Sequence, residues 1–484
     1  MEIRLAASAH GMFDTVLRFL PAGTPVSFGD PGLQSAYAAC FPGDTLTLEH
    51  KQLRCVRMPC QGGFANLLLA GFDSQAAAPF DALRQLAAKA GAALEDFGAA
   101  SVLIDRLDAL TFAPEEEIAS QICAVLPLCE YRFDKYLSVR RERPAISAVL
   151  LSQRDLTPAI QEGLHLSQAV MTARDLVNEI AETLTPAELA RRCEALGRQH
   201  GFETEVLDRA ACEALGMGLF LAVARGSAEE PKFIVMRWRG GEAEQPPIAF
   251  VGKGITYDSG GLAIKRSGME AMRFDMNGAA AVIGAMCAIA DQKLPRNVTA
   301  VVAACENMVD ARSYRNGDVF TSMNGQTVFV RNTDAEGRLT MADAMTYCIR
   351  TEGPSELLEV AGLTGSVCSF YGSVCAAALT THQALFDRVA ALMPVTGEKY
   401  AQMPAFEEYK ALLKTPYADL DNAPAGGPGG ILAGLFLAAF HEDVPFLHID
   451  FGRMPFTDKK SDCQGEGGTG FGVKTLYHYV KNRG

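Results

Sequence analysis

Four acidic residues in the second half of the chain have the type and spacing of metal ligands. Asp258 follows a strand-like apolar run, and Asp275 directly precedes a helix-like one. Asp334 and Glu336 stand one residue apart, ahead of another helix-like segment. Carboxylate oxygens from separate parts of a chain suit hard divalent cations, and two such cations roughly 3.5–4 Å apart can share a carboxylate. The sequence therefore predicts a site for a pair of divalent metal ions.

Helix capping is the simpler explanation for each aspartate taken alone, because Asp is common at the first position of a helix. Three cations, Lys253, Lys265 and Arg338, lie within a few residues of the acids, in stretches with few other long side chains. A structural ion-pair network is a second alternative, but glycine-rich connections are a poor place for one. The combination of acids and cations favours a catalytic site.

Other motifs in the chain give no support for nucleotide binding or for a histidine metal site. Gly252–Tyr257 resembles a dinucleotide loop, but Tyr257 stands where the third glycine is needed. His441 and Glu442 begin an H-E-x-x-H pattern that Pro445 interrupts, and no two of the eight histidines stand four residues apart. His448 is interpreted as a structural histidine. A metal site must then be built from carboxylates.

The elements around the acids alternate between strands and helices. Near-continuous apolar strands alternating with helices indicate a mostly parallel sheet covered on both faces. In such sheets ligands bind beyond the carboxyl ends of the strands, where all four acids are expected. The strand-like runs are 233–238, 247–251, 298–302 and 357–361, and the helix-like runs are 279–290 and 339–349.

The chain is expected to form a smaller α/β domain followed by a catalytic α/β domain. Residues 1–150 mix strand-like and helical stretches but collect no set of complementary titratable residues, so we predict a non-catalytic role, in assembly. Residues 151–484 are predicted to be catalytic, beginning with a linking helix at about 157–177. Thr185 and Glu188 form a capping box for a helix that Gly201 ends.

Composition narrows the classes of partner. The 484 residues carry 44 Lys and Arg against 57 Asp and Glu, a net charge of −13, which disfavours nucleic-acid binding because that affinity comes largely from basic side chains. The N-terminal residues interrupt their apolar stretches with charges, as a signal peptide or membrane span does not. The apolar run 429–440 is too short to cross a bilayer and predicts a buried helix. We expect a cytoplasmic protein without membrane contact.

Longer motifs resemble those of the leucine (cytosol) aminopeptidase family of two-metal exopeptidases. The similarity covers roughly the last 310 residues in the expected order, while residues 1–150 match only in length and general character. The contiguous motif at Asn332–Leu339 is the most specific. The matching segments are 173–179, 219–226, 251–261, 305–308, 332–339, 363–365 and 468–474.

The resemblance implies a role for each charged residue of the site. The tighter ion would be held by Lys253, Asp258, Asp275 and Glu336, and the more exchangeable ion by Asp258, Glu336 and both the side chain and the backbone carbonyl of Asp334. Lys253 as a ligand implies a neutral amine, whose proton the metal displaces. Lys265 and Arg338 would be the catalytic cations.

By the same resemblance, the reaction is removal of the N-terminal residue of a peptide. A hydroxide bridging the two ions would attack the first amide bond while the free α-amine of the substrate binds one ion. Lys265 would stabilise the developing negative oxygen, and Arg338 would hold a bicarbonate that carries the proton to the leaving amine. Zinc or manganese is the expected metal, and a homohexamer, a dimer of trimers, is the expected assembly.

The sequence departs from the family pattern around the substrate pocket. Gly362 stands where the family usually has a threonine, which predicts a wider pocket and leaves a preference for leucine unsupported. The segment 448–452 is one residue shorter than the corresponding family motif. The residues expected to line the pocket are Met272, Gly362, Leu363, Gly365 and Met454.

Two other functions stay open at the level of sequence. One is a non-catalytic role in DNA binding or regulation, which some relatives have and which the net charge disfavours. The other is a different two-metal hydrolase, such as a phosphoesterase. It would cleave a phosphate ester and would not require a free α-amine.

Overall fold

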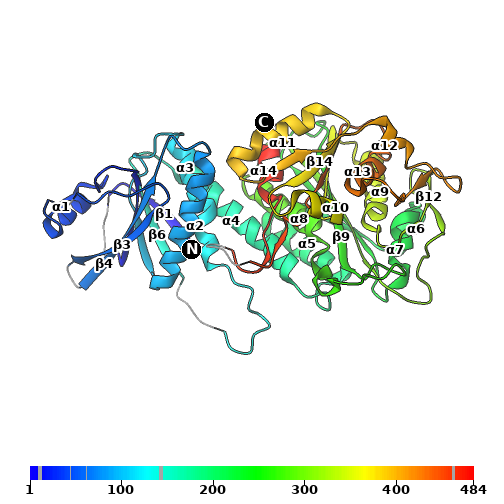
Figure 1. Cartoon of the computed structure of the whole chain (residues 1–484), viewed down its shortest axis with the longest axis horizontal. Coiled ribbons are helices and arrows are strands. Elements are labelled where there is room, and N and C mark those ends of the chain that lie inside the picture. Colours follow the sequence, from blue (N-terminus) through cyan, green and yellow to red (C-terminus); the bar gives the residue numbers. More distant parts are fainter. Residues whose placement is uncertain (9–12, 44, 61–62, 141–144, 460–463, 484) are drawn as a thin grey trace. The chain divides into compact units, whose positions relative to one another are not determined.

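The computed structural model describes residues 1–8, 13–43, 45–60, 63–140, 145–459 and 464–483. It confirms the expected α/β fold (Figure 1). The chain forms two compact units, Met1–Met171 with Lys459–Glu466, and Thr172–Asp458 with Gly467–Gly484. Helix α4 (Thr157–Asn178) appears where a linking helix was expected and contains the point of division. The domain boundary at residue 150 and the role of the N-terminal part stay predictions.

The first unit contains a six-stranded sheet in the order β1-β6-β5-β2-β4-β3. All neighbouring strands in it are parallel except β3, which pairs antiparallel with β4 at one edge. Buried apolar residues of β2, β4 and β5 and of helix α2 form its core. The elements are β1 Glu2–Ala6, β2 Thr15–Pro21, α1 Pro31–Cys40, β3 Leu53–Cys60, β4 Gly63–Phe72, α2 Pro79–Phe97, β5 Ser101–Ile104, α3 Glu115–Val125 and β6 Ser147–Leu151.

The second unit contains an eight-stranded sheet in the order β15-β14-β17-β13-β9-β10-β8-β7. Its four adjacent strands β17, β13, β9 and β10 are parallel, so their carboxyl ends lie along one edge. The strands are β7 Glu203–Leu207, β8 Lys232–Arg239, β9 Ile248–Asp258, β10 Asn297–Asn307, β13 Glu356–Ala361, β14 Ala376–Thr380, β15 Tyr400–Gln402 and β17 Phe446–Asp450.

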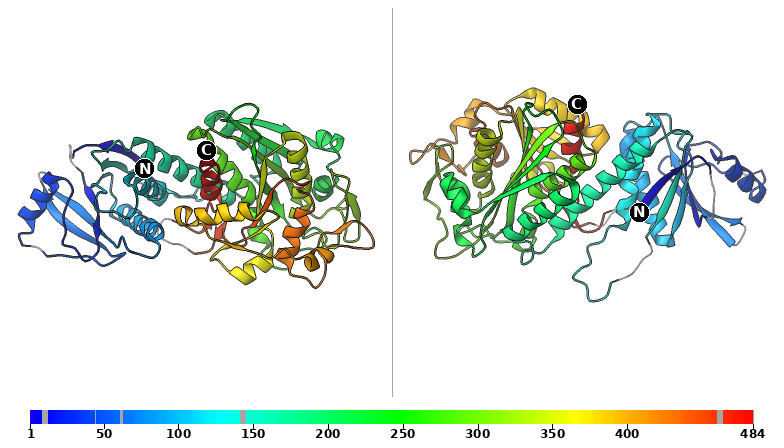
Figure 2. Two further views of the ribbon diagram at one scale, coloured as in Figure 1. Left: turned by 90° about the horizontal axis from the view of Figure 1, so that it is seen from above. Right: turned by 180° about the vertical axis from the view of Figure 1, so that it is seen from behind.

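Helices cover both faces of this second sheet (Figure 2). Helices α5, α8, α11 and α14 pack together on one face, and α7, α9 and α13 pack on the other. Their bounds are α5 Pro186–His200, α7 Gly218–Val223, α8 Asn277–Asp291, α9 Gly337–Tyr347, α11 Gln383–Thr396, α13 Gly429–Ala438 and α14 Val473–Lys481. Shorter elements are α6 Arg209–Ala214, α10 Gly365–Tyr371, α12 Glu407–Ala411, β11 Val319–Thr321, β12 Thr327–Phe329 and β16 Leu420–Asp421.

The predicted start and end of helix α5 form, but only the Thr185 half of the capping box does, since the Glu188 carboxylate accepts from Arg191 and Arg192. The Thr185 side chain accepts a hydrogen bond from the Glu188 amide at 3.3 Å, and Gly201 ends helix α5 at φ +89°. The apolar segment 429–440 contains the buried helix α13. The helical segment Met269–Asp291 is long and apolar enough to span a membrane by length and composition, but 89% of its most apolar window is buried inside the protein. It is a core helix by this measure.

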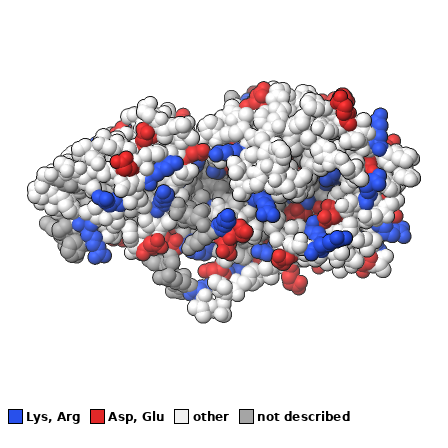
Figure 3. All heavy atoms as spheres, in the orientation of Figure 1, with Lys and Arg blue, Asp and Glu red and all other residues white. Residues whose placement is uncertain are grey.

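Charged side chains of both signs are interspersed on the visible face of the second unit (Figure 3). In this view Lys and Arg lie beside Asp and Glu in the lower part and along the right edge of the unit, while much of its upper part is uncharged. Ion pairs of the second unit include Arg350–Glu442 and Arg315–Asp318. Such pairs contribute little to stability, because both partners remain hydrated.

Candidate metal centre

The carboxyl ends of the four parallel strands bring polar residues together at one edge of the second sheet. Strand β9 ends at Asp258, β10 at Asn307 and β17 at Asp450, while Gly362 and Leu363 follow β13. This is the edge at which open α/β sheets bind their ligands. The predicted site therefore lies at the carboxyl edge of the parallel strands, the usual ligand-binding edge of such a sheet.

Lys253 and Asp258 lie on strand β9 itself, which continues seven residues beyond the apolar run that the sequence indicates. The small size of Gly252 allows strand β9 to continue past residue 251. A Cβ on Gly252 would lie 2.7 Å from the Gly278 carbonyl oxygen, so its absence lets helix α8 pack closely against the strand. Because side chains alternate along a strand, Lys253 points to the opposite face, where its stem passes Gly337 at the start of α9.

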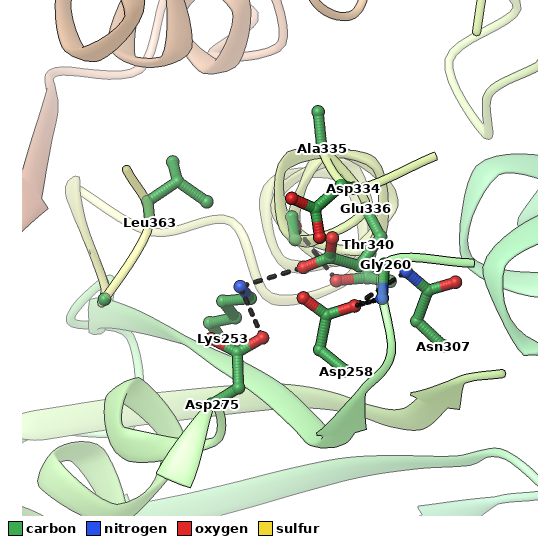
Figure 4. A network of polar contacts seen from close by, with 12 residues as sticks. Lys253, Asp258, Gly260, Asp275, Asn307, Asp334, Ala335, Glu336, Thr340 and Leu363 are labelled. Atoms are coloured by element: carbon green, nitrogen blue, oxygen red, sulfur yellow. Dashed lines mark hydrogen bonds and ion pairs between the residues drawn. The ribbon is translucent and has the colours of Figure 1, made fainter. Parts of the chain in front are cut away.

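The structure brings all four predicted acids together around two lysines, Lys253 and Lys265. Figure 4 shows the acids and Lys253. The Lys253 Nζ lies 2.7 Å from Asp275 Oδ2 and 2.9 Å from Glu336 Oε1.

Lys265 completes the set. Its Nζ lies 2.7 Å from Asp258 Oδ2 and 2.5 Å from Asp334 Oδ1. Four carboxylates thus face two ammonium groups, so half of their negative charge is left for other cations.

Keeping these buried carboxylates charged costs free energy unless further cations bind to them. Asp258, Asp275 and Glu336 are each 5% exposed or less. Burial and, next, the charge of Glu336 raise the pKa of Asp258 to about 6. Within the described residues, Glu336 Oε2 is buried without a hydrogen-bond partner. Buried anions of this kind are normally paired or bound to metal.

The geometry of the oxygens fits divalent ions. One carboxylate oxygen each of Asp258, Asp334 and Glu336 lies within 4.8 Å of the other two. Oxygen donors at such separations suit hard cations, which prefer carboxylate and carbonyl ligands.

Helix capping does not account for the acids. Helix α8 begins after Met276, and α9 begins after Glu336, whose side chain makes no capping hydrogen bond. Asp258 instead accepts hydrogen bonds at Oδ1 from the Gly260 amide at 2.9 Å and from Asn307 Nδ2 at 2.8 Å. Its Oδ2 points toward Lys265.

The two lysines differ in burial. Lys253 is 3% exposed; burial lowers its pKa, but the charges of Asp275, Glu336 and Asp258 raise it by more, so the ammonium form is favoured. A neutral amine at Lys253 therefore requires an ion that displaces the proton. Lys265 is partly exposed, with 17% of its side chain accessible, on the loop after β9.

Arg338 lies in the first turn of α9 and is 7% exposed. Its Nη1 donates a hydrogen bond to the Asn422 carbonyl oxygen at 2.6 Å, and its Nε is buried without a partner among the described residues. Burial lowers the pKa of Arg338 to about 10.

Several residues that position the acids were not singled out from the sequence. Asn307 Nδ2 bridges Asp258 and the Thr333 carbonyl oxygen, at 2.8 and 2.9 Å. Thr333 Oγ1 donates to the Gly260 carbonyl oxygen at 2.7 Å and accepts from the Ala263 amide at 2.8 Å. These contacts join the loop that carries Lys265 to the loop that carries Asp334 and Glu336.

The residues predicted to line the pocket lie on three segments near this edge. Gly362, Leu363 and Gly365 follow β13, and Asp450 holds this loop by accepting from the Leu363 amide at 2.9 Å and the Thr364 hydroxyl at 2.7 Å. Met272 lies in the 3₁₀ helix Met269–Phe274 and Met454 lies after β17. Rings of Phe274 and Phe456, 4.8 Å apart, stack these last two segments together.

Comparisons with known proteins identify the family of the chain. The family described as "Cytosol aminopeptidase family, catalytic domain" matches residues 171–477. The chain is 39% identical over 427 residues to a probable cytosol aminopeptidase of Clostridium perfringens, with 86% of each chain covered. It is 36% identical over 507 aligned positions to a probable cytosol aminopeptidase of Nitratidesulfovibrio vulgaris, with 99% of each covered.

A solved structure is also similar over the whole chain. The bottromycin maturation enzyme BotP in complex with Mn matches with a TM-score of 0.85 and 30% identity, covering 98% of this chain and 100% of that one. The resemblance inferred from the motifs is thereby confirmed. The chain belongs to the cytosol aminopeptidase family, whose members are metal-dependent hydrolases of peptide bonds.

Proposed function

We propose that this protein is an aminopeptidase that removes the N-terminal residue of peptides with the help of two divalent ions. The observation that carries the proposal is the convergence of Asp258, Asp275, Asp334 and Glu336 at the carboxyl edge of the sheet. When bound, such ions polarise the scissile carbonyl, bind the free α-amine and lower the pKa of a shared water. The need for a free α-amine is what makes the activity that of an exopeptidase.

The ligands follow the assignment implied by the family motifs. Lys253, Asp258, Asp275 and Glu336 would hold the tighter ion, and Asp258, Asp334 and Glu336 the more exchangeable one. The Asp334 carbonyl is available for the second ion. Hydrogen bonds between described residues reach the carbonyls of Arg331, Asn332, Thr333 and Ala335, but not that of Asp334.

Lys265 would donate a hydrogen bond to the scissile carbonyl oxygen as that oxygen gains negative charge. Its long side chain and partial exposure allow the Lys265 ammonium to leave Asp258 and Asp334 and contact the substrate instead. Arg338 would hold a bicarbonate ion, which supplies a base for the proton of the attacking water. The buried Arg338 Nε, with no described partner, supports an anion at this position.

The identity of the ions, the assembly and the location are also proposals. Zinc or manganese fits the oxygen-rich donor set, and the similar enzyme BotP was solved in complex with Mn. We propose a cytoplasmic homohexamer, a dimer of trimers, in which residues 1–150 serve assembly. Sedimentation analysis of the purified chain checks the hexamer.

A substrate panel tests the proposed function. Purified protein, stripped of metal and then supplied with zinc or manganese, is offered unblocked and N-acetylated aminoacyl amides and an aryl phosphate. We expect hydrolysis of the unblocked amides only. Turnover of the phosphate ester, or equal turnover of acetylated amides, would show a different two-metal hydrolase.

A further inference from the structure

A buried asparagine far from the acids in sequence holds the loop that carries two of them. Asn422 is fully buried and directly follows strand β16, which pairs in parallel with β12. Its backbone amide donates to the Phe329 carbonyl oxygen at 3.1 Å. This pairing fixes the asparagine beside the start of the segment 331–338.

The side chain of Asn422 makes four hydrogen bonds, all to the backbone of that segment. Oδ1 accepts from the amides of Arg331 at 2.9 Å and Asn332 at 3.2 Å. Nδ2 donates to the carbonyl oxygens of Asn332 at 2.8 Å and Ala335 at 3.3 Å. An amide side chain has two donor hydrogens and two acceptor lone pairs, so one loop uses the full capacity of Asn422.

The same residue also contacts the base of helix α9. Its backbone carbonyl oxygen accepts a hydrogen bond from Arg338 Nη1 at 2.6 Å. Asn422 therefore contacts the chain on both sides of Asp334 and Glu336. Thr333, held by Asn307 and by the Tyr314 hydroxyl at 2.7 Å, fixes the loop from the other direction.

We propose that Asn422 is a positioning residue that orients the Asp334 segment for the more exchangeable ion. The inference rests on the proposed two-metal function. Among the described residues, Asn422 touches no proposed ligand directly but holds the backbone on both sides of Asp334. Replacing outer residues that orient metal ligands typically changes metal affinity about tenfold to a hundredfold. The effect should be larger at the more exchangeable ion, because Asp334 serves that ion alone, whereas the tighter ion is also held by Lys253 and Asp275, which lie on other elements.

Two replacements and a matched control test this role. Asn422→Asp keeps the two acceptor bonds and the size of the side chain but sets an oxygen against the carbonyls of Asn332 and Ala335. Asn422→Ala removes all four side-chain bonds and keeps the backbone carbonyl for Arg338. The control is Asn316→Asp, since the exposed Asn316 also donates to this loop, at the Arg331 carbonyl oxygen, 2.8 Å away.

The measurement is titration of the metal-free, full-length proteins with Mn²⁺, read from the electron paramagnetic resonance signal of the free ion. Thermal unfolding of each variant is recorded alongside. We expect both Asn422 variants to bind the weaker ion about tenfold to a hundredfold less tightly, with the tighter ion little changed. Asn316→Asp should bind both ions as the unaltered protein does.

Three results would overturn the inference. The first is unchanged binding of the weaker ion in either folded Asn422 variant, and the second is an equal loss of affinity at both ions. The third is failure of both variants to fold, because Asn422 would then serve only the stability of the fold. Failure of the unaltered protein to bind two ions would instead contradict the proposed function. The two claims are thus tested separately.

Discussion

The side-chain amide of Asn277 occupies the space into which a side chain at position 362 would project. The Gly362 amide donates to Asn277 Oδ1 at 2.9 Å, and a Cβ on Gly362 would lie 2.7 Å from Asn277 Nδ2. The space beside Gly362 is thus taken by Asn277, and the wider pocket expected from the sequence stays a prediction. Asn277 is 3% exposed and fills the position from helix α8.

Gly362→Thr should destabilise the protein, since the new side chain must displace Asn277. That displacement breaks the hydrogen bonds of Asn277 to the Gly362 amide and the Phe274 carbonyl oxygen, at a cost of about 1–3 kcal/mol. Denaturant unfolding measures the loss. Combining the change with Asn277→Ala should cost less than the sum of the two single changes, and strict additivity would contradict the steric conflict.

Lys265→Ala should lower kcat about a hundredfold to a thousandfold, because it removes a donor aimed at the developing oxyanion. Metal content should not fall, since the change removes an ammonium that competes for Asp258 and Asp334. Steady-state kinetics and metal analysis measure the two effects. The adjacent, exposed Arg266 provides the control as Arg266→Ala. A loss of activity of equal size there would count against a specific role for Lys265.

Asp343→Asn should destabilise the second unit without a direct effect on the chemistry. The buried carboxylate of Asp343 accepts at Oδ2 from the amides of Leu219 and Phe220 and at Oδ1 from that of Met323. An asparagine offers a single oxygen, so at least one buried amide loses its acceptor, at about 1–3 kcal/mol.

The matched control for this prediction is Asp208→Asn. The exposed Asp208 caps helix α6 through the Ala211 amide at 2.9 Å, and asparagine caps helices about equally well. Urea unfolding of both variants gives the comparison. Equal stability of Asp343→Asn and the unaltered protein would show that the three amide contacts are dispensable.

Removing metal should lower the unfolding temperature as well as the activity. Ions that bind only the folded protein stabilise it by about 2.7 kcal/mol when present at a hundred times the dissociation constant. Differential scanning calorimetry with and without a chelator measures the shift, and added manganese or zinc should reverse it. An unchanged transition would mean that the acids at the edge of the sheet hold no ion.

Residue types and local patterns were sufficient to predict the fold class and the set of acids. Charged groups next to apolar strands and helices are unusual unless they are paired or bind a ligand. This makes the four acids stand out: Asp258, Asp275, Asp334 and Glu336. The helix start at Thr185 was likewise predictable, because its capping partner is three residues away.

The amide residues that orient the site could not be predicted in the same way. Asn307 and Asn422 act through partners 26 to 91 residues away, and a sequence pattern does not reveal such pairings. The length of β9 was missed because Gly252 and Gly254 disfavour strands in isolation, whereas packing against α8 and β10 requires them. The contact of Asn277 with Gly362 likewise depends on the tertiary fold, so the sequence alone could not predict it.

The most direct test of the central claim is a count of the metal ions per chain. Protein loaded with manganese, freed of excess ion by dialysis, is analysed by elemental mass spectrometry as the unaltered chain, as Asp258→Asn and as Asp310→Asn, an exposed acid beyond β10. We predict about two ions per chain for the unaltered protein and Asp310→Asn, and a clear loss in Asp258→Asn, which removes one of the two ligands shared by the ions. Equal metal content in all three proteins, or none in any, would contradict the two-metal site.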